Sequence, residues 1–418
     1  MFAKGVNRQY SDQFAITGAK IGASINIRLP NKYFVRKGAA LQAQNTQENT
    51  TTLTLTTQYG VDVNFSTAEL TLSLDDFSQL ILTPAMARLT SQIDQDGLQQ
   101  ALNVYNVVGT PGTTPGAAQA GTAGTFTDNL VPQIYLNAGV WMTNNATPRD
   151  SSRRVIVNPK AMASSVSALT GLWQDSQLIA EQYRKGVLGV AVGFEFAEDQ
   201  NVYSMLLGAH GGTPVVNNAI PGGPQSGAYL YTSGWTPNTQ VLLPGEIFTI
   251  GTGVTPASTC YSLNPENQAS VGSPQSFVVT GYYVGPSGAV TLTPVTSDAS
   301  GNATIPIYPS IVLAGAQVAN ANVDKLPINN TALTFLTGTT ASAVYPQNLA
   351  YHQDAFTLGT ADLELPGGLD FGARETYDGI SMRIIRQYDI NGDQLPCRID
   401  VLAGWATLRP EFATRITG

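Results

Sequence analysis

Two stretches near the end of the 418-residue chain decide its fold: Cys397–Glu411 (CRIDVLAGWATLRPE) and Asn348–Phe356 (NLAYHQDAF). Neither contains a catalytic constellation. Within the first, Arg398–Trp405 is predicted to form the last strand. Ile380–Arg386 (ISMRIIR) alternates partly and predicts another strand, and Asn391-Gly392-Asp393 predicts a turn between them. These strands must complete a sheet that begins earlier, so we expect both ends of the chain to fold as one unit.

The N-terminal part alternates between apolar and polar residues. The alternation runs over 25–29, then over 51–57 and 61–65, and it predicts a strand followed by a hairpin. A polar excursion lies between Pro30 and Thr51. A long two-stranded arm with polar faces has little core of its own and is marginal in isolation. We therefore expect it to pack against a neighbouring subunit, although an ordinary surface hairpin would show the same pattern.

The segment that follows carries helical signals mixed with strands. Ser66 and Glu69 have the form of a capping box, and Pro84 can begin or kink a helix. An apolar stripe then recurs at three and four residues, at Met86, Leu89, Ile93, Gly97 and Ala101. Further expected elements are a helix over 128–144, a strand over 154–159 that enters a helix at Pro159, a helix over 176–185 and strand over 187–202. This order indicates an α+β domain.

Residues 205–345 differ from the rest of the chain in sequence pattern, because helix periodicity nearly disappears and Gly, Pro, Thr and Ser become frequent. Short strand candidates follow one another, namely Ala228–Thr232, Glu246–Ile250, Ser276–Thr280, Ala289–Thr293, Ala303–Tyr308 and Ala332–Phe335. Turn residues such as Pro244-Gly245 separate them. The pattern is typical of a small all-β barrel or sandwich, inserted into an α+β domain that resumes at Asn348.

Composition limits the function. Charged residues make up 12% of the chain, about half the ~25% of ordinary soluble domains. Both a neutral-polar β protein and a subunit covered by copies of itself fit this. The net charge of −8 argues against tight nucleic-acid binding, so if the protein encloses DNA, it acts as a container and not as a reader. The two cysteines, Cys260 and Cys397, are far apart and lack metal-ligand spacing, and no membrane span or signal peptide is apparent.

Catalytic and metal-binding patterns are weak. The two histidines, His210 and His352, fall in different predicted domains, which argues against a His-dependent triad or a two-His metal site. Acidic pairs (Asp75/Asp76, Glu198/Asp199 and Asp389/Asp393) are better explained by helix starts and turns. The last of them lacks the distal glutamate of a calcium loop. We expect no enzymatic activity, no cofactor and no metal.

The chain resembles the tailed-bacteriophage major capsid proteins of the P22 coat type, which have an HK97-like fold with an inserted β-domain. The resemblance is carried, in matching order, by the two stretches above and by Phe2–Tyr10 (FAKGVNRQY), Gly18–Gly22 (GAKIG), Ser66–Asp76 (STAELTLSLDD), Arg154–Pro159 (RVIVNP) and Glu181–Gly186 (EQYRKG). It covers nearly the whole chain outside the middle third. Related coat proteins carry a further N-terminal arm before the segment matching Phe2–Tyr10, whereas this sequence begins almost at that segment.

The resemblance implies a division of the chain. The expected parts are an N-terminal arm (1–24), an extended hairpin or E-loop (25–65), a spine helix with the peripheral domain (66–127), the first part of an axial α+β domain (128–204), an inserted β-barrel (205–345), and strands that complete the peripheral and axial domains (346–418). Candidate subunit-interface residues are Arg8, Arg28, Lys32, Arg36 and Lys37. Some HK97-like shells crosslink a lysine to a neighbour's asparagine, which would suit Lys32 or Lys37, but the P22 branch does not work this way.

The function implied is that of a major capsid protein of a tailed double-stranded DNA bacteriophage, which self-assembles into an icosahedral shell around the genome. The expected partners are copies of itself in hexamers and pentamers, scaffolding and portal proteins, a decoration protein, and packaged DNA bound without sequence specificity. No membrane is involved. The expected location is the virion capsid, assembled in the cytoplasm of the bacterial host.

A second hypothesis comes from another class. A β-rich binding or adhesion protein could use residues 205–345 as a carbohydrate- or host-surface-binding module. Aromatic residues there could stack on sugars, although barrel cores need aromatics too; they are Tyr229, Tyr231, Trp235, Tyr282 and Tyr283.

Overall fold

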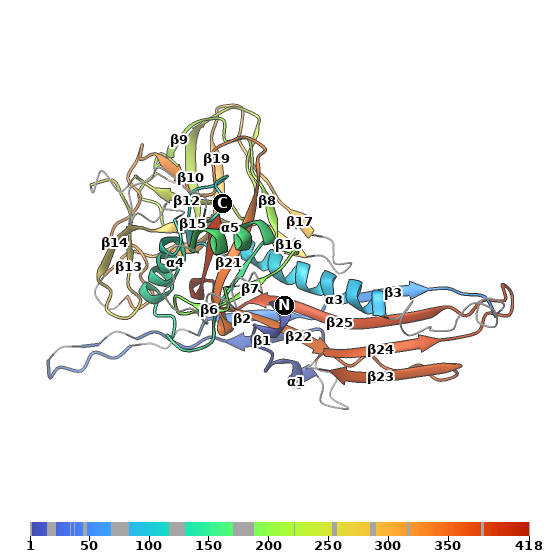
Figure 1. Cartoon of the computed structure of the whole chain (residues 1–418). Helices are drawn as coiled ribbons and strands as arrows, with labels where there is room; N and C mark the ends of the chain where they lie inside the picture. Colours follow the sequence, from blue (N-terminus) through green and yellow to red (C-terminus); the bar gives the residue numbers. More distant parts are fainter. Residues whose placement is uncertain are drawn as a thin grey trace.

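The computed structural model of the chain describes residues 2–14, 22–33, 35–36, 38–44, 48–67, 83–116, 130–169, 188–220, 222–252, 257–284, 290–315, 318–377 and 380–417. A body of strands and helices occupies the middle of the molecule (Figure 1). A thin arm leaves it at one end, and a long ribbon of strands leaves it at the other. Glu69 of the expected capping box, the helix expected over 176–185 and residues 117–129 lie outside the described residues.

The main sheet of the body combines strands from before and after the central segment. Its strand order is β4-β26-β21-β5-β7-β6, and β8 also pairs with β21. The strands are β4 (Val107–Val108), β5 (Arg153–Val157), β6 (Val190–Ala191), β7 (Phe194–Glu198), β8 (Ser204–Leu206), β21 (Val344–His352) and β26 (Ala413–Thr417). Because β21 pairs antiparallel with both β5 and β26, the two halves of the chain form one unit, as predicted.

Two helices belong to this part of the body. In α4 (Gln133–Asn144), Ile134, Ala138 and Trp141 form the predicted apolar stripe and are buried in the same cluster as residues of β5 and β21. The helix begins later than the expected residue 128, directly after Pro132. The second helix, α5 (Pro159–Leu169), begins at the expected proline, where the missing N–H of proline costs nothing because no intrahelical bond is due there.

The ribbon is built around one long strand. β25 (Cys397–Thr407) pairs with β3 (Thr57–Val63) and β24 (Ile380–Arg386) through its first part and with β22 (Phe356–Ala361) through its second part. β23 (Phe371–Tyr377) pairs with β24 and forms an outer edge. Two sequence expectations need correction. The strand over 398–405 is not the last, because β26 follows it. The hairpin expected over 51–65 is not formed either, since β2 (Thr50–Thr54) pairs with β1 (Ser24–Arg28) and β3 with β25.

The long helix α3 (Thr83–Leu98) lies along the start of the ribbon and continues into a 3₁₀ turn, η3 (Gln99–Asn103). Leu89, Ile93 and Gly97 of the predicted stripe are buried. Met86 is 42% exposed, so the stripe begins one turn later than expected. Ala101 is buried at the far end, within η3.

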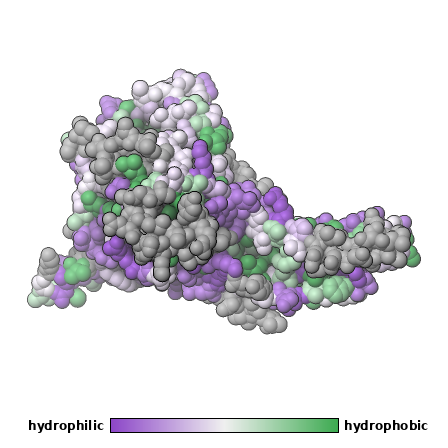
Figure 2. Space-filling view, in the orientation of Figure 1, coloured by the Kyte–Doolittle hydropathy of each residue, from purple (hydrophilic) through white to green (hydrophobic). Residues whose placement is uncertain are grey.

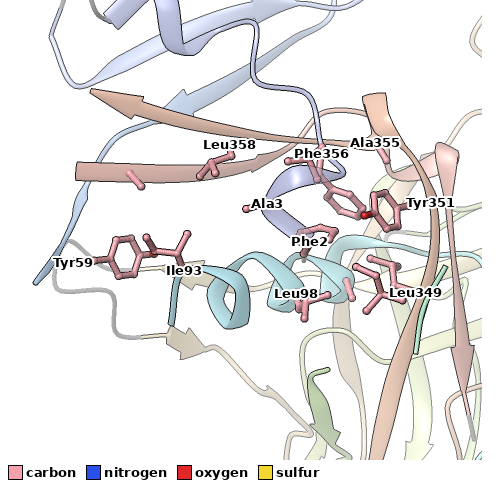
Figure 3. Packing of buried hydrophobic residues seen from close by; sticks show 14 of the residues in the cluster. Phe2, Ala3, Tyr59, Ile93, Leu98, Leu349, Tyr351, Ala355, Phe356 and Leu358 are labelled. Atoms are coloured by element: carbon pink, nitrogen blue, oxygen red, sulfur yellow. The ribbon is translucent and has the colours of Figure 1, made fainter. Parts of the chain in front are cut away.

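The core under α3 gathers residues from distant parts of the chain (Figure 3). Phe2, in the turn η1 (Phe2–Lys4), lies among Leu98 of α3, Tyr351 of β21 and Phe356 of β22 and is fully buried. Its ring also stacks on Trp405 at 5.2 Å between centroids. Gly97 permits this approach, because a Cβ there would lie 2.5 Å from the Trp405 ring and 2.8 Å from the Phe2 ring.

The central segment, residues 205–345, has its own sheet and its own core. The strand order is β20-β12-β15-β19-β10-β9, with β9 (Gly212–Val216), β10 (Gly227–Trp235), β12 (Ile247–Ile250), β15 (Ser276–Val279), β19 (Ala303–Ile311) and β20 (Leu333–Phe335). Strand pairs β11 (Gln240–Leu242) with β18 (Val295–Thr296), β13 (Tyr261–Leu263) with β14 (Ser270–Pro274), and β16 (Tyr282–Val284) with β17 (Val290–Leu292) accompany it. Buried residues such as Leu230, Phe248 and Phe277 fill its interior.

Alternating charges cross the ribbon from strand to strand. Asp62 of β3 accepts two hydrogen bonds from Arg398 of β25, at 2.7 and 3.0 Å. Asp400, two residues further along β25, pairs with Arg383 of β24. The first pair is exposed, whereas the second is nearly buried, with side-chain exposures of 11% for Arg383 and 2% for Asp400. These cross-strand pairs stabilise a thin sheet that has little apolar core.

We expect Phe2→Ala to lower the free energy of unfolding of the unassembled subunit by about 3–5 kcal/mol, because it leaves a cavity between α3, β21 and β22. Denaturant unfolding of the purified subunit measures this. Phe371→Ala is the matched control. Its ring is 46% exposed on the edge of the ribbon, so the loss there should stay within about 1 kcal/mol. Equal losses would contradict the packing described.

The two charge pairs of the ribbon should respond differently to loss of their carboxylates. Asp400→Asn leaves Arg383 nearly buried without a counter-charge and should cost about 3 kcal/mol. Asp62→Asn should cost less than about 1 kcal/mol, because water and salt screen an exposed pair. Hydrogen exchange of residues 57–63 and 380–386 in each variant measures both. A larger effect at Asp62 than at Asp400 would refute the assignment.

The exposed pair also has a pH signature. Arg398 holds the pKa of Asp62 below its usual value by hydrogen bonding. The stabilisation by this pair is therefore fully present above the ordinary pKa of aspartate and is lost as the pH falls through the lowered value.

Candidate assembly surfaces

The arm comprises residues 29–49 between β1 and β2. Its base is closed by a hydrogen bond from the Leu29 amide to the Asn49 carbonyl, at 2.8 Å. Beyond the base, Tyr33 is 61% exposed, and Val35 and Leu41 are each 87% exposed. Figure 2 shows apolar residues among polar ones where the arm leaves the body. Apolar side chains gathered on a projecting segment mark a surface that another molecule covers.

The structure separates the predicted interface residues. Arg28 lies at the base of the arm, 3.6 Å from Glu48 of the same hairpin, so an acidic partner exists within the chain. Arg36 is exposed further out, where its guanidinium donates to the Gly38 carbonyl. Lys37 lies outside the described residues. Arg8 is not on the arm: its Nε donates to the Ala3 carbonyl at 2.8 Å and holds the first turn of the chain.

Lys32 lies near the root of the arm, close to Glu411. Burial raises the pKa of Glu411, and the positive charges of Lys32 and Arg409 oppose this rise. Among the predicted residues that the structure describes, Lys32 and Arg36 are the exposed cations of the arm for which no ion pair is seen.

The outer edge of the ribbon is a second unpaired surface. Among the described strands, β23 has a neighbour on one side only, β24, so its other side presents backbone groups that no described strand pairs with. Beside it, Leu365 is 39% exposed and Phe371 46% exposed. Glu364 and Glu375 are also exposed, and no ion pair is seen for either in the described part of the chain. Sequence reasoning missed this edge, since nothing local distinguishes an edge strand from an inner one.

Several of the acidic and histidine residues considered for chemistry have partners within the described part of the chain, whereas Asp75 and Asp76 lie outside it. His352 Nε2 lies 3.2 Å from Asp150, and His210 contacts Glu246 in another part of the molecule. Asp389 accepts hydrogen bonds from Asn391 within its turn. Across the described ranges, no three His, Cys, Asp or Glu residues lie close enough to hold a metal ion. Both cysteines are buried and free. No described helix is long and apolar enough to span a membrane.

The predicted aromatic residues of the central segment that the structure describes differ in their surroundings. Trp235 is 3% exposed and donates its indole N–H to Thr232, so it belongs to the core. Tyr229 is 55% exposed, and Tyr231 lines a cavity of about 560 Å³. The side chains of Tyr282 and Tyr283 lie outside the described residues.

Comparison with known proteins gives one matching family model and a set of similar solved structures. The family model described as "P22 coat protein - gene protein 5" matches residues 268–418. No curated protein matches the chain. Similar solved structures include one from Mycobacterium phage Che8 (12% identity, TM-score 0.45, covering 100% of this chain and 90% of that one), the capsid of cyanophage P-SCSP1u (11%, 0.43, 100% and 87%) and the capsid of Ralstonia phage GP4 (8%, 0.42, 99% and 86%).

The family match includes both stretches that carry the resemblance most strongly. Asn348–Phe356 forms the inner part of β21 and the start of β22, and Cys397–Glu411 forms β25 and the turn after it. Both lie in the part of the body that joins the two halves of the chain. The predicted resemblance is therefore confirmed over residues 268–418, which match the model of the P22 coat protein family.

Proposed function

We propose that this protein is the major capsid protein of a tailed double-stranded DNA bacteriophage, with an HK97-like fold, and that its copies form the icosahedral shell of the virion. The observation that carries the proposal is the family match over residues 268–418, which contains the strands that close the body. The exposed arm and the open ribbon edge support it, because both suit a subunit that is completed by its neighbours.

The central segment, residues 205–345, is in this proposal an inserted β-barrel. Its separate core supports that assignment. A bridge between Val215 and Ala332 places β9 next to β20, at the two ends of the strand order, as barrel closure requires. The residues before and after the segment, in β8 and β21, pair with each other, so its removal would leave a continuous body.

The arm, in this proposal, reaches a second copy of the chain. The arm and the ribbon leave the body at opposite ends (Figure 1), so one copy presents the arm where the next copy presents its ribbon. Such head-to-tail contacts between identical subunits close into rings when the rotation permits. Hexamers and pentamers are rings of this kind. Each contact can be weak, because many contacts act together in a closed shell.

Charge indicates the receiving surface. The arm carries Arg36 and Lys37 without an acidic residue between Arg28 and Glu48. The edge of the ribbon carries the exposed Glu364 and Glu375 beside exposed apolar residues. The Glu364 carbonyl accepts a hydrogen bond from Arg383, which holds this acidic stretch against β24. We therefore assign Glu364 and Glu375 of a second copy as the acidic partners of the arm.

The remaining partners follow from this role. Scaffolding and portal proteins would act during assembly in the host cytoplasm, and a decoration protein could cover the finished shell. The net charge of −8 supports enclosure of DNA without sequence-specific binding. The role requires no catalytic centre, and Lys32 and Lys37 are assigned to contacts and not to crosslinks. Denaturing mass spectrometry of particles should then give the 44.2 kDa subunit alone.

The proposal predicts that Arg36→Glu/Lys37→Glu lowers the yield of particles about tenfold or more while the subunit stays soluble, because like charges then meet at each arm contact. Sedimentation and electron microscopy of the protein, co-expressed with a scaffolding partner, measure the yield. Arg88→Glu/Lys160→Glu changes the net charge equally on exposed positions of α3 and α5 and serves as the control.

A charge swap tests the receiving surface separately. Adding Glu364→Lys/Glu375→Lys to the arm variant should restore particles, since opposite charges face each other again. Normal shells from the arm variant alone would refute the arm contact, and failure of the swap would refute its assigned partner. If the unmodified protein stays a monomer or trimer and binds glycans, the adhesion hypothesis is correct instead.

A further inference from the structure

Three ionisable side chains are buried together where the central segment meets the body. We call His210, Glu246 and Arg415 the junction cluster. His210 lies between β8 and β9, Glu246 directly precedes β12, and Arg415 lies in the middle of β26. The side chain of His210 is 3% exposed and that of Glu246 is fully buried, as is Arg415. Neither the arm nor the ribbon uses this cluster, and the proposed function does not require it.

Glu246 holds the near side of the junction together. Its Oε1 accepts hydrogen bonds from the amides of Gly208, at 2.8 Å, and Leu243, at 2.7 Å. Its Oε2 contacts Nε2 of His210, whose ring packs on Phe335 with 4.5 Å between centroids. The chain segment that leads into the central segment and the turn before β12 are thus gathered around one acceptor.

Arg415 approaches from the body. Its Nη2 donates to the Gly245 carbonyl, and its Nη1 lies 3.4 Å from Gln347 Oε1 and 3.5 Å from the Met205 sulfur. Burial lowers the pKa of Arg415 to about 9, and the negative charge of Glu246 opposes that decrease. Arg415 therefore keeps its charge at neutral pH. Its charge and that of Glu246 offset each other inside the protein.

A glycine makes this approach possible. Gly245 has a φ of +94°, which side chains with a Cβ rarely adopt. A Cβ at this position would lie 2.4 Å from Leu102 of η3 and 3.2 Å from the Met205 sulfur. The turn before β12 can therefore lie directly on the body and offer its carbonyl to Arg415.

We propose that Arg415 is an anchor that fixes the central segment on the body, and that it does so only when β26 is paired between β21 and β4. Pairing of β26 carries Arg415 to the Gly245 carbonyl and to the neighbourhood of Glu246. Without it, the Gly245 carbonyl would lose this donor and the positive charge of Arg415 would no longer lie near the buried Glu246, which is unfavourable. The orientation of the central segment is thereby coupled to completion of the main sheet.

The test is hydrogen exchange of residues 205–210 and 240–246 in the full chain. Arg415→Met and Glu246→Gln are each expected to increase exchange there about tenfold or more, because each removes a charge that offsets the other inside the protein and Arg415→Met also removes the donor to the Gly245 carbonyl. The double variant removes both charges. If the two substitutions acted independently, the double variant would show the product of the two single increases in exchange rate. We expect a smaller increase than that product. Arg398→Met, which removes an exposed arginine of the ribbon, is the control and should leave these residues unchanged.

A second measurement separates loss of anchoring from general unfolding. The inner strands β12 and β15 belong to the core of the central segment and should keep their protection in all variants. The proposal is overturned if Arg415→Met changes exchange at the junction less than twofold, if the double variant shows the full product of the single effects, or if β12 and β15 lose protection to the same extent. Each outcome is independent of whether the protein forms shells.

Discussion

Backbone pairing between strands that are far apart in the sequence is the constraint on which this structure depends. β21 joins the main sheet beside β5, and β25 pairs with β3, so neither half of the chain can complete its sheet without the other. The core that contains Phe2 has the same character, because its members come from the first turn, α3, β21, β22 and β25. Such long-range pairing must close large loops before it is stabilised, which makes folding slow and cooperative.

The interior of the central segment does not depend on strand pairing with the two halves of the body, whereas the orientation of the segment does. Its own buried cluster supplies the apolar burial that a small domain needs. Its connection to the body also relies on polar groups, with Glu246 and Arg415 buried on facing sides. Apolar contacts tolerate small shifts, whereas buried hydrogen-bonded charges demand a defined geometry. The interior of the segment is thus apolar, whereas its contact with the body also includes buried polar groups.

The local sequence pattern predicted where strands occur better than it predicted which strands pair with each other. The strands expected in the central segment agree closely with β10, β12, β15 and β19, because alternation and turn residues are local signals. The predicted pairing of β3 was wrong, because the alternation over 57–63 indicates which face of the strand is apolar but not which strand lies beside it. β26 was missed because an arginine in the middle of a short stretch that contains threonines is typical of a surface segment. The burial of Arg415 depends on Glu246 and Gly245, which are distant in the sequence.

The arm and the ribbon show two different ways to extend a chain away from its core. The ribbon is a sheet whose strands bind one another through Asp62, Arg398, Asp400 and Arg383, so it can keep its form without a neighbour. The arm has hydrogen-bonded strands at its base only, and its apolar side chains Val35 and Leu41 lie in water. Exposing them is unfavourable in the free subunit and is relieved by any surface that covers them. The ribbon is thus suited to receive a neighbour, and the arm to be ordered by one.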